Sequence, residues 1–336
     1  MKKIKLGIVG TGIAARDLHL PGLKELKDKF EIVALFNRTK EKAIQFSKLL
    51  DNNPKICDSY DELLDKVEAV DLALPVQLNF EFIEKALKKG VDVICEKPIS
   101  INVEEGKKIV ELSKKYKNVI YIAENYRHFS AFDKIRELTS KIGKVHYLQW
   151  NLWIFMSKDN KYTNTKWRQT PQHIGGFISD AGVHHVASMR KIFGDIKWVY
   201  GSIKNITDYL GGPDLLSSTF EFENGILGNY NVSYALDGKN ILMIKGELGD
   251  IIFEDDIVKV INNKEKSIEY YDDYKTHDEN SYKKEFEDFY EVINGKDNDL
   301  GNSEEALKDL AFIEAAIKSN GEKRIYINDL INLRLS

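Results

Sequence analysis

Two side chains that could move a proton lie four residues apart in the second half of the chain. Asp180 and His184 fall in a segment predicted to be helical, residues 179–193, where this spacing places them on one face. An imidazole has an unperturbed pKa of about 6.5, so it can exchange the proton of a hydroxyl near neutral pH. The carboxylate could fix the tautomer of the imidazole or bind a neighbouring hydroxyl. His185 points about 100° away and is expected to pack.

A metal site is the alternative for this segment. Asp180, His184 and His185 could ligate a metal, but the sequence offers no evident third and fourth ligand. We therefore predict no metal and favour acid–base catalysis. The remaining histidines have no comparable partner in the sequence: His19, His128, His146, His173 and His277.

A lysine at the end of an apolar run is the second candidate for chemistry. Residues 91–95 predict a buried strand, which runs into Glu96-Lys97-Pro98. Pro98 biases Lys97 away from helical geometry, so its side chain should project from an extended or turn conformation. At the carboxyl end of a parallel strand, where ligands collect, such a lysine could stabilise a developing alkoxide. A solvated surface lysine is the alternative, and Glu96 is expected to be a cofactor-side or structural contact.

A glycine turn near the start of the chain predicts a dinucleotide site. An apolar strand over residues 4–9 continues into Gly10-Thr11-Gly12-Ile13-Ala14-Ala15, which fits the pattern G-x-G-x-x-G/A. The first glycine permits a tight turn, the second lets backbone approach a pyrophosphate, and the last alanine keeps helix and strand close. A helix predicted over residues 13–29 would present its first N–H groups to the phosphates.

The end of the second strand favours a phosphorylated cofactor. The strand predicted over residues 31–36 is followed by Asn37-Arg38-Thr39, where an acidic residue would favour NAD. Arg38 can pair with a 2′-phosphate, its two neighbours offer neutral hydrogen bonds, and Lys42 could add a second cation. A helix start capped by Thr39 is the alternative explanation. We favour NADP(H) over NAD(H).

The elements that must position these residues form two domains. Strands and helices alternate through residues 1–124, which predicts a doubly wound parallel sheet, an α/β dinucleotide-binding domain. Residues 125–336 predict an α+β domain with a large, mostly antiparallel sheet, marked by the hairpin signal Asn224-Gly225, whose last helix could pack back on the first domain. The carboxyl edge of the parallel sheet would gather the glycine turn, Asn37, Arg38, Thr39, Leu74, Pro75, Glu96, Lys97 and Asn125.

Two further features of the second domain suggest contacts. The polar, aromatic stretch over residues 156–176 is long for a structureless loop, so we interpret it as a lid or a cofactor-contacting loop. Tyr and Phe at alternating positions are expected on the outward face of the sheet, which predicts a homodimer or homotetramer formed through that sheet. Arg127 and Arg168 could bind substrate or cofactor, or pair with surface acids.

Composition excludes several classes of partner. Hydrophobic residues make up 43% of the 336 residues and charged residues 30%, the profile of a soluble globular protein. A net charge of -4 implies no basic face for nucleic acid. No apolar run approaches the roughly 18 residues that span a membrane. Cys57 and Cys95 have no metal-type spacing, and a reducing cytoplasm fits such sparse cysteine usage.

Taken together, these motifs resemble the Gfo/Idh/MocA family, the glucose–fructose oxidoreductase and inositol dehydrogenase group of pyridine-nucleotide enzymes. The resemblance rests on the glycine turn, on Pro75 opening a helix that carries Asn79, and on Glu96-Lys97-Pro98. It covers nearly the whole chain. The family's second motif, G-G-G followed by D-x-G-x-H, is matched by Asp180, Gly182 and His184. Two positions depart from the pattern: Phe177 replaces the third glycine, and Ala187 stands where an acid is frequent.

The resemblance implies further site residues. The family's Lys-Pro bond is typically cis, with the lysine beside the nicotinamide, which implies the same for Lys97. Trp167, Arg168 and Tyr282 match positions near the cofactor, as does Asn79. These residues join the glycine-turn set as predicted cofactor contacts, while Arg127 joins Lys97, Asp180 and His184 as a predicted substrate contact.

The sequence therefore predicts an NADP(H)-dependent oxidoreductase acting on a hydroxyl or carbonyl of a sugar, a polyol or a related small molecule. His184 would exchange the proton, Lys97 would polarise the reacting oxygen, and Asp180 would orient His184 or the substrate; a proton carried by Lys97 is the alternative. Three other activities suit the same scaffold: an NAD-dependent glycosidase, reduction of an imine or a linear tetrapyrrole, and cofactor sensing without catalysis.

Overall fold

The computed structural model describes residues 2–272 and 280–332. The chain divides into two compact units, one formed by Met1–His128 with Glu279–Leu307 and the other by Phe129–Asp278 with Lys308–Ser336. The chain thus returns to the first unit late in the sequence, and the last change of unit falls within α10 (Ser303–Ser319). His277, one of the histidines named above, lies outside the described residues.

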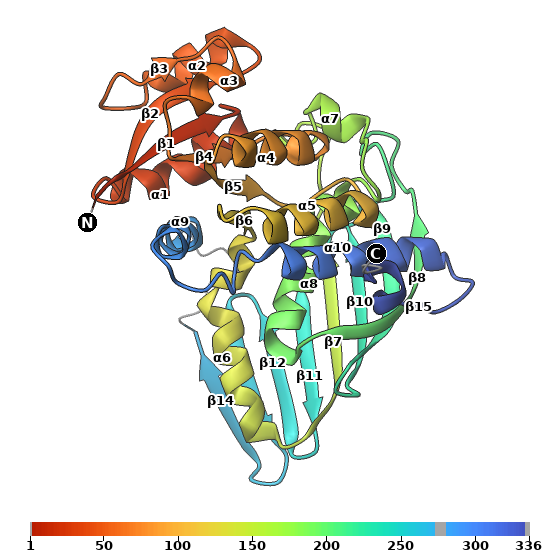
Figure 1. The fold of residues 1–336 in the computed structure, drawn as a ribbon. Helices are drawn as coiled ribbons and strands as arrows, with labels where there is room; N and C mark the ends of the chain where they lie inside the picture. The colour runs from red at the N-terminus through yellow and green to blue at the C-terminus, as the bar shows by residue number, and fades with distance from the viewer. Residues whose placement is uncertain (1, 273–279, 333–336) are drawn as a thin grey trace. The chain divides into compact units, whose positions relative to one another are not determined.

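The first unit is built on a six-stranded sheet in which every pair is parallel, in the order β3-β2-β1-β4-β5-β6 (Figure 1). The order reverses between β1 and β4, so the sheet is doubly wound, as predicted. Its central strands are apolar runs because helices cover both faces. The strands are β1 (Ile4–Val9), β2 (Phe30–Phe36), β3 (Lys55–Ile56), β4 (Ala69–Leu72), β5 (Asp92–Glu96) and β6 (Ile120–Ala123).

Helices α1, α2 and α9 contribute to the core on one face of this sheet, and α3 and α4 pack on the other with α5 beside α4. On the first face, Phe30 packs against the rings of Phe286, Phe289 and Tyr290 from α9. The helical elements are η1 (Ala15–His19), α1 (Leu20–Glu25), α2 (Lys40–Ser47), α3 (Tyr60–Leu64), η2 (Val76–Leu78), α4 (Asn79–Lys88), α5 (Val103–Lys115), η3 (Asn125–His128) and α9 (Asn280–Ile293).

The first helix differs from its prediction. A single helix over residues 13–29 was expected, but η1 is a π-helical segment, and the α1 that follows ends at Glu25. Pro21, near the start of α1, has no N–H to complete the regular ladder, and the wider π turn lies immediately before it. The predicted strands of the sheet are present within one or two residues at most ends.

The second unit is an α+β body with a nine-stranded sheet in the order β14-β13-β12-β11-β7-β10-β9-β8-β15. The pair β7–β10 is parallel and the remaining pairs are antiparallel, which confirms the predicted mostly antiparallel sheet. The strands are β7 (Val145–Trp153), β8 (Ile196–Lys204), β9 (Leu215–Phe222), β10 (Leu227–Ser233), β11 (Ile241–Gly246), β12 (Gly249–Glu254), β13 (Ile257–Asn262), β14 (Ser267–Tyr271) and β15 (Ile325–Tyr326).

Helices cover one face of this sheet. Figure 1 shows α6 (Ser130–Leu138) and α8 (Phe177–Phe193) beside it, and Phe312 of α10 contacts Phe220 and Tyr230 on the same face. The expectation that Phe would line the outward face is wrong, because Phe220, Phe222 and Phe253 are buried on the helix-covered side. Period-two alternation specifies two faces but does not say which one is covered.

The outward face carries mainly polar side chains. Tyr147 donates to Asn229 Oδ1 at 2.5 Å, and the Asn231 side chain donates to Asn151 Oδ1 at 2.8 Å. Strands β14 and β15 and the short helix α11 (Ile327–Ile331) were not predicted. None of the helices within residues 2–272 and 280–332 combines the length and apolar character that a membrane crossing needs.

Candidate active site

The glycine turn after β1 has the geometry of a close backbone approach. Gly10 has a φ of 89°, and a Cβ placed on it would lie 2.4 Å from the carbonyl oxygen of Ala73. Its N–H donates to the Phe36 carbonyl at 2.9 Å, which joins the turn to the end of β2. Glycine is therefore needed at this position both for its conformation and for space. Leu74 and Pro75, which follow the strand beside the turn, are half-buried.

The end of β2 is fastened to the same turn through Asn37. Its Oδ1 accepts from the N–H of Thr11 at 3.1 Å, and its Nδ2 donates to the Thr39 carbonyl at 2.9 Å. Thr39 precedes α2, yet its side chain makes no capping hydrogen bond. Arg38 and Lys42 are exposed, and neither side chain makes a hydrogen bond or an ion pair with another described residue. Two cations therefore lie near the end of β2, as the sequence predicted.

The residues of the turn fit a bound dinucleotide. A Cβ built on Gly12 meets no atom within 4 Å, so the space outside this glycine is open. The Thr11 side chain is buried, and its Oγ1 has no hydrogen-bond partner within the described part of the chain. Helical residues begin at Ile13, so the first N–H groups of the helix lie next to this space. A bound pyrophosphate would accept a hydrogen bond from the Thr11 hydroxyl and occupy the open space beside Gly12.

The turn after β5 holds Lys97 in a defined place. The Lys97–Pro98 peptide bond is cis, as the family resemblance implies, and the Lys97 side chain is half-buried. The buried Asn79 side chain donates to the carbonyl oxygens of Glu96 and Pro98 at 3.2 and 3.0 Å. Asn79, predicted as a cofactor contact, therefore secures the backbone on both sides of Lys97, and its contact with a cofactor stays a prediction.

A buried histidine joins this turn to the interior of the sheet. His19, the last residue of η1, is fully buried, and its Nδ1 lies 2.9 Å from Asp71 Oδ2. Its Nε2 lies 2.9 Å from Oε1 of Glu96, the residue before Lys97. The expectation that His19 lacks a partner is wrong. The missed signal is Asp71 itself, since an acid inside a buried strand needs a partner.

The protonation of this cluster follows from its surroundings. Burial alone would lower the pKa of His19, but the Asp71 charge and the hydrogen bonds to Asp71 and Glu96 raise it well above its usual 6.5. Glu285 of α9 is fully buried, and neither carboxyl oxygen has a hydrogen-bond partner among the described residues. Burial and the negative charge of Glu96 raise the pKa of Glu285 well above its usual 4.5.

Stability is expected to fall with rising pH because of His19. Folded His19 keeps a proton that the unfolded chain releases above its pKa of 6.5. Its contribution is full below that value and is lost as pH rises through the folded pKa, with a slope of up to about 1.4 kcal/mol per pH unit. Urea unfolding at several pH values should show that the free energy of unfolding falls less steeply with pH in His19→Gln than in the wild type. Glu285→Gln serves as the comparison, because the raised pKa of Glu285 also lowers the free energy of unfolding as pH rises. Equal slopes for wild type and His19→Gln would contradict this account.

Three other predicted site residues lie within the first unit. The Asn125 side chain is buried and donates to Ser281 Oγ at 3.0 Å. Arg127 is also buried and donates to the Leu300 carbonyl at 3.0 Å. The Tyr282 ring lies 6.1 Å from the His19 ring. Each residue therefore has a structural contact, and its role toward cofactor or substrate stays a prediction.

In the second unit, α8 presents the predicted acid–base pair. Gly175 and Gly176, both with positive φ, lead into the helix. Asp180 lies in its first turn, where the helix dipole favours a negative charge. Arg168 Nε donates to Asp180 Oδ2 at 2.7 Å, and the guanidinium lies 4.1 Å from the centroid of the Trp167 ring.

The two adjacent histidines of α8 have different environments. His184 is half-buried and lies one turn after Asp180 on the same face. His185 is buried, and its Nδ1 lies 2.7 Å from the hydroxyl oxygen of Tyr230, so it packs in the interior as predicted. His173, in the stretch interpreted as a lid, is buried against Ser179 Oγ at 2.8 Å. This stretch also contains the short helix α7 (Lys166–Gln169).

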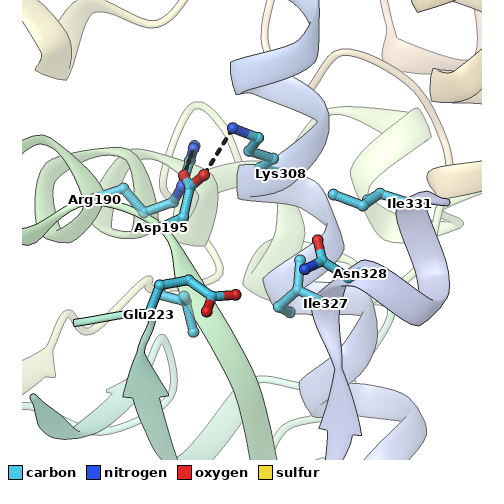
Figure 2. A pocket seen from close by; sticks show the side chains of 8 residues that line it. Arg190, Asp195, Glu223, Lys308, Ile327, Asn328 and Ile331 are labelled. Carbon is cyan, nitrogen blue, oxygen red and sulfur yellow. Dashed lines mark hydrogen bonds and ion pairs between the residues drawn. The ribbon is translucent and has the colours of Figure 1, made fainter. Parts of the chain in front are cut away.

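A small cavity of the second unit, about 60 Å³, contains none of the predicted site residues. Figure 2 shows Arg190, Asp195 and Lys308 pointing toward one another at its wall. Asp195 accepts from Arg190 at 2.5 Å and from Lys308 at 2.8 Å. These charges are paired with each other, so the cavity gives no sign of a ligand. Within residues 2–272 and 280–332, no three His, Cys, Asp or Glu side chains are placed to hold a metal.

Comparison with known proteins assigns both parts of the chain to one protein family. A family model described as an oxidoreductase family with an NAD-binding Rossmann fold matches residues 4–124, and the model of its C-terminal alpha/beta domain matches residues 136–328. The chain belongs to the Gfo/Idh/MocA family. Gfo/Idh/MocA membership confirms the resemblance drawn from the sequence. It also supports a nicotinamide cofactor and a dehydrogenase or reductase activity.

Two relatives and one complex illustrate the Gfo/Idh/MocA likeness. The yeast protein YMR315W from Saccharomyces cerevisiae is 34% identical over 97% of this chain and 99% of its own. An oxidoreductase crystal structure from Thermotoga maritima is 51% identical, with a TM-score of 0.92, over 98% of this chain and all of that one. An Agrobacterium radiobacter oxidoreductase in complex with NAD+, L-tartaric acid and magnesium is 18% identical, with a TM-score of 0.84 over 98% of this chain and 100% of that one, a likeness of fold alone.

Proposed function

We propose that this protein is an NADP(H)-dependent oxidoreductase that interconverts a hydroxyl and a carbonyl group on a sugar, a polyol or a related small molecule. The observation that carries the proposal is the glycine turn, where the open space at Gly12 and the buried Thr11 hydroxyl lie at the carboxyl edge of the parallel sheet. The cofactor supplies or accepts the hydride when it is bound.

The chain's own residues supply the rest of the reaction. In the direction of oxidation, His184 takes the hydroxyl proton while Lys97 stabilises the negative charge that develops on the oxygen. Asp180, held by Arg168, orients His184 or a substrate hydroxyl. Arg127 is the fourth proposed substrate contact. Hydrogen bonding to a partly charged oxygen is worth more in a site that excludes water, which favours a lysine that is half-buried rather than solvated.

The preference for NADP(H) rests on the end of β2. Arg38 is exposed and makes no ion pair with a described residue, and Asn37 stands where an acid would select NAD. Replacing Arg38 with alanine should weaken NADPH binding by about tenfold to a hundredfold, since a hydrogen bond to a charged group contributes about 1.5–3 kcal/mol.

Fluorescence titration with NADPH and NADH measures this effect. NADH binding should change little in Arg38→Ala, because NADH lacks the phosphate that Arg38 would contact. Lys48→Ala, which removes an exposed cation after the last turn of α2, is the matched control and should leave both affinities unchanged. Tighter binding of NADH than NADPH by the wild-type protein would contradict the assignment.

The activity is tested with a panel of sugars, polyols and aldehydes, using whichever cofactor binds. Net change in the absorbance of the reduced nicotinamide supports the proposal. Release of an aglycone without such a change would instead indicate a glycosidase. Turnover of imines or linear tetrapyrroles alone would place the substrate in another class, and tight cofactor binding without turnover of any class would favour a sensor.

Assembly and location complete the proposal. A homodimer or homotetramer is proposed to form through the outward face of the nine-stranded sheet. Light scattering that gives the mass of one 38.6 kDa chain would contradict it. A reducing cytoplasmic location is supported by two free cysteines, Cys57 and Cys95, which are both buried.

A further inference from the structure

The buried His19 lies between two carboxylates, and this geometry restricts its charge. Nδ1 faces Asp71 at 2.9 Å and Nε2 faces Glu96 at 2.9 Å. A neutral imidazole has one N–H and one acceptor nitrogen, whereas an ionised carboxylate can only accept. Both hydrogen bonds can therefore form together only if His19 is an imidazolium or if one of the two acids holds a proton. The first arrangement places a cation between two anions in the interior of the first unit.

The other groups around His19 favour the imidazolium. Tyr282 and Glu285 of α9 lie near His19, and the buried Cys95 of β5 lies near both Glu96 and Asp71. Burial raises the pKa of Glu285 and so favours its neutral form, and its two oxygens find no hydrogen-bond partner among the described residues. His19 thus lies against two carboxyl groups, Asp71 and Glu96, whose charges and hydrogen bonds raise its pKa and so favour the imidazolium.

This cation acts on the segment that carries Lys97. Glu96 is the last residue of β5, with its side chain 13% exposed, and Lys97 follows it directly. The Glu96 carboxylate is held by His19, and its carbonyl is held by Asn79. Side chain and backbone of the residue before Lys97 are therefore both anchored. Loss of the imidazolium would remove the group that faces both Asp71 and Glu96 from the buried side, a change that proteins relieve by movement or proton uptake.

We propose that His19 is a positioning residue: its imidazolium bridges Asp71 and Glu96 and thereby fixes the backbone that presents Lys97 to the reacting oxygen. This role rests on the proposed function, in which Lys97 stabilises charge. His19 does not touch substrate or cofactor. It belongs to η1, directly after the glycine turn, so one short segment supplies both the phosphate turn and the support for Lys97.

The charge of His19 can be measured without any substrate. Nitrogen-15 NMR spectra of the full chain labelled at histidine report the protonation of each ring nitrogen. The His19 signals are assigned by their loss in His19→Gln. We expect both nitrogens to be protonated at neutral pH. A neutral His19 ring under these conditions would overturn the proposal, whether or not the protein proves to be an oxidoreductase.

Measurements of kcat then distinguish a positioning role of His19 from a role in stability alone. For folded His19→Gln, judged by stoichiometric NADPH binding, kcat should fall by about a hundredfold, since misplacement by about 1 Å can have this effect. NADPH affinity should change little, and the pH profile of kcat should shift. Adding Asp71→Asn to His19→Gln should recover part of the loss, because it removes the buried carboxyl group that has lost its imidazolium partner.

His128 supplies the matched control. It lies in the same unit, is partly buried, and its Nε2 lies 3.0 Å from the neutral Tyr121 hydroxyl. His128→Gln should keep the wild-type kcat and pH profile. Wild-type kcat and pH profile in folded His19→Gln would overturn the positioning role while leaving the proposed function intact. If wild type shows no cofactor-dependent turnover, the proposed function and the positioning role both fail, and the spectra still decide the charge of His19.

Discussion

Replacing Lys97 with alanine is expected to lower kcat by about 10²- to 10³-fold, the effect of removing one donor that stabilises a developing oxyanion. Lys97 follows β5 at the carboxyl edge of the parallel sheet, where ligands of such sheets bind. Its turn is anchored by Asn79 and contains a cis peptide bond. Steady-state kinetics with the cofactor and substrate identified in the panel would measure the loss. The affinity for NADPH should change far less than kcat, because the lysine acts on charge that develops in the transition state.

Two further variants separate charge from geometry at Lys97. Lys97→Arg keeps the charge but replaces a compact ammonium by a planar guanidinium, so it should recover little of the activity. Lys85→Ala is the control, since Lys85 forms an exposed pair with Glu81 on α4 and should be dispensable. Wild-type kcat in Lys97→Ala would exclude Lys97 from the reaction. An equal loss in Lys85→Ala would indicate a general effect on the first unit.

The parts of the fold that follow from local patterns were predictable. The glycine turn joins β1 to the helical residues that begin at Ile13, and apolar runs mark the other strands of the parallel sheet. Alternation of strands and helices then determines a doubly wound order with little freedom. The hairpin at Asn224-Gly225 connects β9 and β10, again because two adjacent residues specify the turn. In each case the information lies within a few residues of the element it describes.

The cluster around His19 could not be predicted in the same way. His19 is 52 residues from Asp71 and 77 residues from Glu96 in the sequence. Their contact requires the π-helical segment to end above β4 and β5, and neither helix periodicity nor the glycine pattern specifies that turn. The acid inside β4 is the one local sign, because a carboxylate in a buried strand demands a partner without naming it.

Two other features depend on tertiary structure. The local pattern predicts a helix near α9 but not its place in the core of the first unit. There Phe286 and Phe289 pack against Phe30, a contact that joins residues far apart in the sequence. The buried side of the nine-stranded sheet depends on where α6, α8 and α10 pack. Phe220 and Phe253 therefore face helices rather than the outward face on which they were expected.

The acid–base role assigned to His184 has the second large expected effect. The side chain is half-buried on α8, one turn after Asp180, whose carboxylate is held by Arg168 at 2.7 Å. His184→Asn should lower kcat by about 10²- to 10⁴-fold, the usual contribution of a positioned acid or base. In the direction of oxidation the imidazole acts as a base, and in reduction it acts as an acid.

His185 makes this prediction specific to one ring. It is adjacent in sequence but buried, with its Nδ1 2.7 Å from the Tyr230 hydroxyl. His185→Asn should reduce the free energy of unfolding by about 1–3 kcal/mol, the effect of leaving a buried polar group unsatisfied, while the folded fraction keeps its kcat and pH profile. His184→Asn should do the reverse, with a large loss of kcat and little change in the free energy of unfolding. If His184→Asn retained the wild-type kcat, the proton would have to be carried by another group, and Lys97 would be the first to test.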